Sequence, residues 1–207
     1  MVEINLHKAA KRFQYEWVFR NIDHVFPPGS RTALTGNNGS GKSTLLRCIA
    51  GQTPLTSGDI DYKLGTASIS SANHYQYISI SAPYLELPEE FTLLEFLRFH
   101  FSFKGYKKGY NLHKVVEAMY LNNALNKQIL NFSSGMKQRL KLGICLFSNA
   151  KLLLLDEPTT NLDKQGIDWY QETIKTRTEG CTLIVASNEA REYGFCDADL
   201  QMQKYKA

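Results

Sequence analysis

The stretch GNNGSGKST, residues 36–44, constrains this chain more than any other, because it matches the pattern G-x-x-x-x-G-K-[ST] of loops that bind nucleotide phosphates. Such a loop works between a buried strand and the start of a helix, where free backbone N–H groups and the helix dipole favour an anion. The sequence supplies both neighbours: RTALT (31–35) is predicted to be a strand, and KSTLLRCIAG (42–51) a helix that Gly51 can terminate. The loop therefore predicts a nucleotide ligand, with a chance glycine-rich turn as the alternative.

Each residue type in this loop has a chemical reason. Gly36, Gly39 and Gly41 let the backbone turn tightly and bring its N–H groups close to the phosphates. Lys42 is expected to pair with the β- and γ-phosphates, and Ser43 to offer its hydroxyl to Mg²⁺. The predicted nucleotide-binding residues of the loop are Gly36, Asn37, Asn38, Gly39, Ser40, Gly41, Lys42, Ser43 and Thr44.

A second motif lies far along the chain, where the apolar run LLLL ends in Asp156 and Glu157 before a proline. A strand of leucines would deliver Asp156 to the edge of a sheet beside the glycine loop, where a carboxylate can hold Mg²⁺ through water. Glu157 would then reach the γ-phosphate region and polarise an attacking water as a general base. A strand that ends in two solvated acids is the alternative, and the presence of the glycine loop argues against it.

A third motif is the stretch NFSSGMKQRLKLGICLF, residues 131–147, which has apolar residues on one side of a predicted helix. Ser133 stands at the N-cap position, so the start of this helix offers a second anion site, separate from the glycine loop. One chain does not easily bring both sites to one phosphate if a helical lobe projects from the core, whereas two facing copies can. A capped core helix is the alternative for this stretch taken alone.

The order of the predicted elements indicates a single domain with an α/β core and an inserted helical lobe. Continuous apolar runs such as LLLL (152–155) and LIVA (183–186) suit a parallel sheet that helices cover on both faces. The alternating stretch YQYISIS (75–81) is predicted to be another strand. From about residue 87 to residue 149 the apolar spacing is helical, which predicts a core of residues 1–86 and 150–207 around this helical subdomain.

Composition excludes several classes of protein. Charged residues make up 21% of the 207 residues and the net charge is +4, with no run of Lys and Arg long enough to predict a nucleic-acid partner. No apolar run approaches the roughly 18 residues that span a bilayer, and the N-terminus has no signal-peptide pattern. The four cysteines are scattered and form no C-x-x-C pair, and Cys145 and Cys181 lie within apolar runs, which indicates reduced core thiols and a reducing cytoplasm. A role at a membrane would need another chain to do the spanning.

The order of four motifs resembles the ATP-binding cassette (ABC) ATPase family, and the match runs nearly end to end. The motifs are the glycine loop, FSSGM (132–136), LLLLDEP (152–158) and TTNLD (159–163). FSSGM is similar to the signature sequence of that family, usually written LSGGQ. The resemblance implies a P-loop NTPase core with a mostly parallel sheet, an antiparallel β subdomain and an inserted helical subdomain. It also implies ATP and Mg²⁺ as cofactors, ATP hydrolysis, and a head-to-tail homodimer or heterodimer in which the glycine loop and the partner's signature sequence sandwich each ATP.

The same resemblance implies a place for the protein in the cell. It predicts a cytoplasmic subunit, peripheral on the inner face of the membrane, that drives separately encoded transmembrane permease subunits and has no nucleic-acid partner. In the family the permease docks where this chain has APYLEL (82–87) and EFLRFHFSFKGY (95–106). A satisfied helical core explains the same apolar pattern.

Roles of individual residues follow from the resemblance too. Phe13 stands where the family has an aromatic residue that stacks on adenine, with Tyr15 as a nearby alternative. The implied contacts with the partner's γ-phosphate and the dimer seam come from Ser133, Ser134, Gly135 and Asp163. The implied catalytic and metal-binding residues are Glu157, Lys42, Asn188, Ser43, Asp156 and Ser81.

Two positions depart from the family's pattern. The family has a glutamine at the end of the strand before the helical lobe, whereas this chain has Ser81, and Gln76 lies too early on the strand. A serine is shorter, so Ser81 would serve the metal only through an intervening water. The family's switch histidine is replaced by Asn188, which donates a hydrogen bond but does not titrate near neutral pH. Because Glu157 is retained, we predict slow hydrolysis.

Three other hypotheses stand beside the transporter subunit. A soluble ABC-type protein acting on DNA or ribosomes is disfavoured by the lack of long heptads, of a second cassette and of a basic face. An unrelated phosphate-loop enzyme such as a small-molecule kinase leaves FSSGM and TTNLD unexplained. A nucleotide-gated regulator that closes on ATP and barely hydrolyses it is kept open by Ser81 and Asn188.

Overall fold

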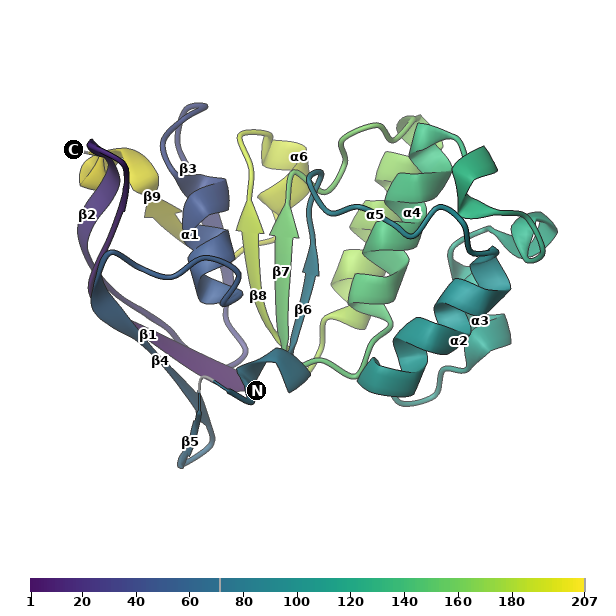
Figure 1. Cartoon of the computed structure of the whole chain (residues 1–207), viewed down its shortest axis with the longest axis horizontal. Coiled ribbons are helices and arrows are strands. Elements are labelled where there is room, and N and C mark those ends of the chain that lie inside the picture. Colours follow the sequence, from purple (N-terminus) through teal and green to yellow (C-terminus); the bar gives the residue numbers. More distant parts are fainter. Residues whose placement is uncertain (71, 207) are drawn as a thin grey trace.

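The computed structural model describes residues 1–70 and 72–206 and contains two β-sheets, with helices on both sides of the larger one (Figure 1). The larger sheet is parallel, in the order β6-β7-β8-β3-β9. Its strands are β3 (Arg31–Thr35), β6 (Ile78–Ser81), β7 (Leu152–Asp156), β8 (Thr182–Ala186) and β9 (Ala198–Gln201). Because parallel strands end at one edge of a sheet, the loop after β3 and the acidic end of β7 lie near each other.

The central strands β7 and β8 are buried along their whole length. Side chains of a strand alternate between its two faces. Leu153 and Leu155 of β7 therefore pack into the apolar cluster of the helical segment, whereas Leu152 and Leu154 pack into the cluster that contains α1 (Lys42–Ile49). The leucine run thus serves two cores at once, as the sequence predicts for a covered parallel sheet.

A second, antiparallel sheet lies on the other side of α1 (Figure 1). Its strand order is β2-β1-β4-β5, formed by β1 (Val2–Phe13), β2 (Glu16–Phe26), β4 (Ser57–Leu64) and β5 (Ala67–Ile69). Apolar residues of β1 and β2 share one cluster with the buried face of α1, so this helix lies between the two sheets. This sheet is the antiparallel subdomain that the resemblance implies, and the predicted fold class is confirmed.

Helices fill the segment whose apolar spacing is helical, on the side of the large sheet away from α1 (Figure 1). The helices on this side are α2 (Leu93–Lys104), α3 (Leu112–Ala118), α4 (Ser134–Leu146) and α5 (Lys164–Arg177). A capping box starts α2, because the Thr92 hydroxyl accepts from the Glu95 N–H while the Glu95 carboxylate accepts from the Thr92 N–H. The domain boundaries near residues 87 and 149 stay a prediction.

Short elements complete the chain. They are the 3-10 helices η1 (His74–Gln76), η2 (Asn122–Ala124), η3 (Ile129–Asn131) and η4 (Met202–Tyr205), and the single-turn helix α6 (Ala190–Tyr193). The strand predicted over 75–81 is wrong at its start, because residues up to Gln76 form η1 and the strand begins at Ile78. Helix α1 ends at Ile49, and Gly51 follows with a φ of +73°, which suits its predicted role as terminator.

No helix within residues 1–70 and 72–206 combines the length and the apolar character needed to cross a bilayer. The cysteines in this part of the chain are free thiols, and Cys48, Cys145 and Cys181 are buried, as predicted for the last two. Burial raises the pKa of Cys145 to about 12, so this thiol stays protonated.

Gly58, at the start of β4, provides a stability test of how the antiparallel sheet packs. Its φ is +82°, and a Cβ there would lie 2.4 Å from the carbonyl oxygens of His7 and Lys8. These oxygens belong to the backbone of β1 and cannot rotate away, so we expect Gly58→Ala to lower the free energy of unfolding by about 3 kcal/mol.

Gly65 supplies the matched control, because its φ is +63° but a Cβ there would meet no described atom within 4 Å. Gly65→Ala should cost about 1 kcal/mol from its backbone conformation alone. Urea unfolding measures both variants, and equal losses would contradict the clash at Gly58.

Candidate functional site

The glycine loop joins the end of β3 to the start of α1 and curls around its own lysine. Lys42 Nζ donates hydrogen bonds to the carbonyl oxygens of Gly36 (2.6 Å) and Asn37 (3.2 Å). Gly36, Gly39 and Gly41 have φ values of +134°, +76° and +94°, which residues with a side chain adopt only with strain. Burial lowers the pKa of Lys42, and two nearby carboxylates oppose that decrease. A bound anion would compensate the charge of this partly buried ammonium group.

A hydroxyl and a buried carboxylate meet beside this loop. Ser43 Oγ donates to Asp156 Oδ1 over 3.0 Å, which joins the first turn of α1 to the end of β7. Asp156 is 2% exposed, and burial raises its pKa to about 6, although the hydrogen bond from Ser43 opposes the increase. A buried carboxylate with little compensating charge, next to a hydroxyl oxygen, fits a hard divalent cation such as Mg²⁺. Ser43 and Asp156 are the residues that would hold such an ion.

Glu157 follows Asp156 and is exposed. Its φ is +43°, and its backbone N–H donates to the carbonyl oxygen of Ala186 at the end of β8 (2.9 Å). The side chain lines one hollow together with Lys42 and Ser43 of the glycine loop. Left-handed backbone at such a residue costs on the order of 1–3 kcal/mol and often marks a functional position. The structure therefore brings the predicted general base to the mouth of the phosphate site.

Asn188 lies after β8 and reaches the glycine loop from a position 150 residues away in the sequence. Its Nδ2 donates to Asn38 Oδ1, and both residues line a hollow with Thr35, Gly36 and Tyr193. The structure thus brings the predicted switch position to the phosphate loop. An amide donates from this place at every pH near neutrality, because it does not titrate there.

Ser81 does not lie with the metal pair, that is, with Ser43 and Asp156, the two residues that would hold the ion. The register of β6 and β7 pairs Ser81 with Leu155, so these two side chains share one face of the sheet and Asp156 lies on the other. Ser79, which shares the face of Ser81, lies within hydrogen-bonding reach of the Cys145 thiol on α4. Ser81 is fully buried, and its Oγ has no hydrogen-bond partner among the described residues. This placement argues against the expected water-mediated contact between Ser81 and a metal, because the sheet separates them.

The serine-capped helix end forms a separate site on the helical side. Ser133 is the N-cap of α4, and its Oγ accepts from the Met136 N–H over 3.2 Å, while Ser133 and Ser134 are exposed. Asp163 caps α5 by accepting from the backbone N–H three residues on (2.8 Å). These residues and Gly135 line one hollow, whose lining residues differ from those around the glycine loop. The two predicted anion sites therefore occupy different places on one chain.

The aromatic candidates for adenine stacking lie at the end of β1. Phe13 is 49% exposed and has Lys11 Nζ 4.8 Å from its ring centroid, whereas Tyr15 in the following turn is 94% exposed. β2 reaches the glycine loop, because a Cβ on Gly41 would lie only 2.8 Å from Val18 Cγ1. The turn end of this hairpin thus borders the glycine loop, and Phe13 is the less exposed of the two rings.

Two further residues, to which the sequence analysis gives no individual role, contact each other next to α1. Arg47 stands one helical turn after Ser43 on α1, and its guanidinium carbon lies 3.8 Å from the ring centroid of Tyr84. Its charge also opposes the increase in the pKa of Asp156. The i, i+4 spacing from Ser43 is a signal that can reveal Arg47. Tyr84 lies between β6 and α2, and no periodic pattern marks it.

Comparison with known proteins agrees with this geometry. Residues 19–160 match the model of the family described as ABC transporter. The chain belongs to this family. It is an ATP-binding protein of the ABC transporter type, which makes transport and ATPase activity the functions of its class.

Several bacterial ABC proteins are similar over most of the chain. YybJ of Bacillus subtilis (strain 168), named an uncharacterized ABC transporter ATP-binding protein, is 28% identical over 98% of this chain and 92% of its own length. SrtF of Streptococcus pyogenes, named a lantibiotic transport ATP-binding protein, is 29% identical over 89% of this chain and 80% of its own. LnrL of Bacillus subtilis, named a linearmycin resistance ATP-binding protein, is 31% identical over 90% of this chain and 62% of its own.

Solved structures share the fold. The dimeric ABC transporter cassette MJ0796 superposes with a TM-score of 0.80 over 97% of this chain and 95% of its own, at 20% identity. A putative ABC transporter ATP-binding protein from Pyrococcus furiosus gives a TM-score of 0.81 over 99% of this chain and all of its own, at 21% identity. At this identity the likeness establishes the architecture alone.

Asp156 predicts a pH-dependent stability in the ligand-free ABC protein. Its pKa of about 6 in the folded protein lies above the ordinary value of 3.8. The protonated carboxyl therefore favours the fold below about pH 4, and this contribution is lost as the pH rises through 6. We expect Asp156→Asn to be more stable than the natural protein by roughly 2–3 kcal/mol at about pH 8 and equally stable near pH 4. Urea unfolding at both pH values measures this, and an equal difference at both would contradict it.

Proposed function

We propose that this ABC protein closes on ATP as a head-to-tail dimer, with a second copy or a related chain, and that closure and hydrolysis drive separately encoded membrane-spanning partners. The separation of two anion sites on one chain carries the proposal. The glycine loop and the Ser133 N-cap line different hollows, and each lies at the start of a helix. A triphosphate bound in the loop of one copy would be completed by residues 133–135 of the other.

The relatives support this proposal. SrtF and LnrL are named for lantibiotic transport and linearmycin resistance, and MJ0796 is described as a dimeric cassette. Asp163 lines the same hollow as the exposed serines, which suits a residue at the seam between two copies.

Within a closed site each group would have a task. Ser43 and Asp156 would hold Mg²⁺, which when bound neutralises charge on the phosphate oxygens. Glu157 would accept a proton from the attacking water. Asn188 would donate a hydrogen bond to a γ-phosphate oxygen, and Phe13 would stack on the adenine. The backbone N–H groups of the glycine loop would bind the phosphates together with its lysine.

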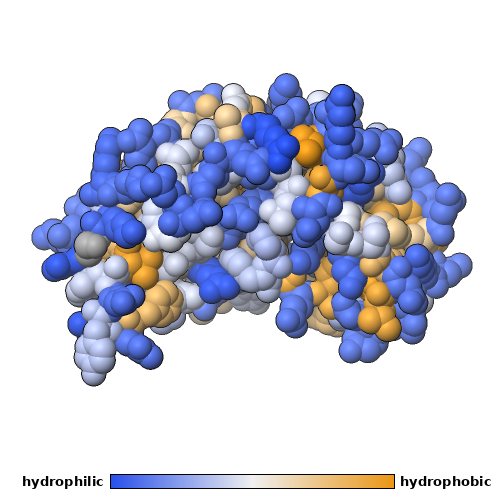
Figure 2. Space-filling view, turned by 90° about the horizontal axis from the view of Figure 1, so that it is seen from above, coloured by the Kyte–Doolittle hydropathy of each residue, from blue (hydrophilic) through white to orange (hydrophobic). Residues whose placement is uncertain are grey.

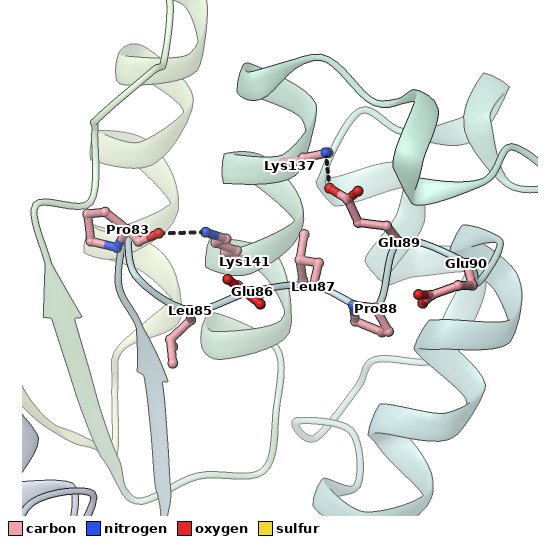
Figure 3. A pocket seen from close by; sticks show the side chains of 9 residues that line it. All are labelled: Pro83, Leu85, Glu86, Leu87, Pro88, Glu89, Glu90, Lys137 and Lys141. Carbon is pink, nitrogen blue, oxygen red and sulfur yellow. Dashed lines mark hydrogen bonds and ion pairs between the residues drawn. The ribbon is translucent and has the colours of Figure 1, made fainter.

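A groove between α4 and the segment before α2 is the proposed docking site of the membrane partner (Figure 3). Two lysines of α4 bind the segment before α2 across the groove. Lys141 Nζ donates to the carbonyl oxygen of Pro83 (3.0 Å), and Lys137 pairs with Glu89. Because α4 begins at the exposed serines, a partner seated in this groove would act on the second anion site. The residues that line the groove are Pro83, Leu85, Glu86, Leu87, Pro88, Glu89, Glu90, Lys137 and Lys141.

Apolar side chains also reach the surface over the helical part of the molecule, on the right of Figure 2. Phe99 and Phe103 of α2 are 55% and 77% exposed, and their rings meet edge to face with centroids 5.1 Å apart. Exposed aromatic residues of this kind suit a protein partner. The protein would then act as a peripheral cytoplasmic subunit on the inner face of the membrane, with no nucleic acid as partner.

A slowly hydrolysing, nucleotide-gated regulator is the second candidate. Ser81 faces away from the metal pair, and Asn188 cannot exchange a proton near neutral pH. The site therefore lacks two groups with which the family normally handles the attacking water and the γ-phosphate.

The dimer is tested with a variant that binds ATP without hydrolysing it. Glu157→Gln with MgATP is expected to elute as a dimer in size-exclusion chromatography with light scattering. Adding Ser134→Glu should return it to a monomer, because a carboxylate would then face the γ-phosphate across the interface. Binding of a fluorescent ATP analogue by the glycine loop should persist in that double variant. A strictly monomeric Glu157→Gln protein at high concentration would overturn the proposal.

The rate of ATP hydrolysis distinguishes the transporter subunit from the regulator. Loss of a general base costs roughly 10²- to 10⁴-fold in rate, so Glu157→Gln is expected to lower ATP turnover of the purified protein by at least about a hundredfold. Asn188→His should raise the rate and make it depend on pH near neutrality, because histidine titrates there. Equal turnover by the natural protein and Glu157→Gln would show that Glu157 is idle and would favour the regulator.

A further inference from the structure

The peptide bond between Pro158 and Thr159, just after the proposed general base, is held from both sides. On one side the Gln138 amide of α4 donates to the carbonyl oxygen of Pro158 over 2.8 Å. On the other side the Thr159 N–H donates to a carboxylate oxygen of Glu192 over 2.7 Å, and the Thr159 hydroxyl donates to the same oxygen. Gln138, Thr159 and Glu192 are each 3% exposed, so water does not weaken these hydrogen bonds.

Glu157 depends on this backbone for its direction, because its carboxylate accepts no hydrogen bond from the described part of the chain. Its N–H is fixed by the carbonyl oxygen of Ala186 at the end of β8. On its other side stands Pro158, whose ring fixes φ and leaves little freedom before the clamped peptide bond. A residue with a φ of +43° keeps that conformation only when the surrounding contacts impose it. The hydrogen bonds from Gln138 and Glu192 are among these contacts.

The two clamping residues come from elements that carry other parts of the proposed ATP site. Gln138 lies in the second turn of α4, the helix that begins at the exposed serines. Glu192 lies on α6, four residues after Asn188, and its own carbonyl oxygen accepts from the Tyr170 hydroxyl of α5 over 2.7 Å. The backbone after the general base is therefore joined to the helix of the second anion site and to the segment that reaches the glycine loop.

We propose that Gln138 and Glu192 are positioning residues, which keep the Glu157 carboxylate directed at the attacking water during ATP hydrolysis. This inference rests on the proposed function, in which Glu157 is the general base. Neither residue lines the hollow that Glu157 forms with the glycine loop, so both would act through the backbone and not on the substrate. A reacting group displaced by about 1 Å can lose on the order of a hundredfold in rate.

Gln138→Met and Glu192→Met test the inference, because each removes one side of the clamp and keeps a side chain of similar length. We expect kcat for ATP to fall about tenfold in each, with the affinity for a fluorescent, non-hydrolysable ATP analogue unchanged. Glu192→Gln should keep the natural rate, because an amide oxygen can accept both hydrogen bonds from Thr159. In the Glu157→Gln background, Gln138→Met should cause no further loss, since its effect passes through Glu157.

Thr178→Val is the matched control, because it also removes a buried hydrogen bond from a side chain to the backbone, here to the carbonyl oxygen of Ile174 (2.7 Å). It should lower the urea midpoint and leave kcat unchanged. An unaltered kcat in both methionine variants would overturn the inference, and so would an equal loss caused by Gln138→Met in the Glu157→Gln background. Equal turnover by the natural protein and Glu157→Gln would instead overturn the proposed general base, and the inference with it.

Discussion

The hydrogen bond between Ser43 and Asp156 is the contact on which the rest of the site depends. It spans 3.0 Å and joins two residues 113 positions apart. It forms because the glycine loop leaves β3 at the same edge of the parallel sheet at which β7 ends, with β8 between the two strands. Glu157 is placed by following Asp156 directly, and Arg47 by following Ser43 one turn along α1. A shift of α1 relative to the sheet would therefore move Ser43 and Arg47 away from Asp156 and Glu157.

The alternation of side chains along a strand decides which residues can join this site. Asp156 faces the side of α1, whereas Leu155 and Ser81 face the helical segment. A one-residue difference in position therefore separates the carboxylate proposed to bind the metal from a buried serine on the far side of the sheet. The segment after β6 returns to the α1 side through Tyr84, whose ring reaches Arg47. The loop after β6 thus contacts α1, on the side of the sheet that Ser81 does not face.

The site combines a strained backbone with buried charge. Glu157 adopts a φ of +43°, and its backbone is held by the end of β8. Burial lowers the pKa of Lys42 and raises that of Asp156, so both groups are less stable when charged than they would be in water. A triphosphate and a divalent cation carry the charges that would relieve both, which is the physical reason why this geometry suits MgATP. The folded protein keeps this arrangement without a ligand, and the strained backbone and the buried charges lower its stability.

The sequence by itself determined the ligand class, the family and most of the proposed site. The motifs that revealed them are short: GNNGSGKST, FSSGM and LLLLDEP. A glycine turn, a serine cap and a strand end each depend on a few consecutive residues, so local sequence is enough to predict them. Only the tertiary structure decided that Ser81 faces away from the metal pair, that Asn188 binds Asn38, and that Tyr84 stacks on Arg47. These facts depend on strand register and on the path of loops, which are set by packing between residues far apart in the chain, and no local spacing encodes them.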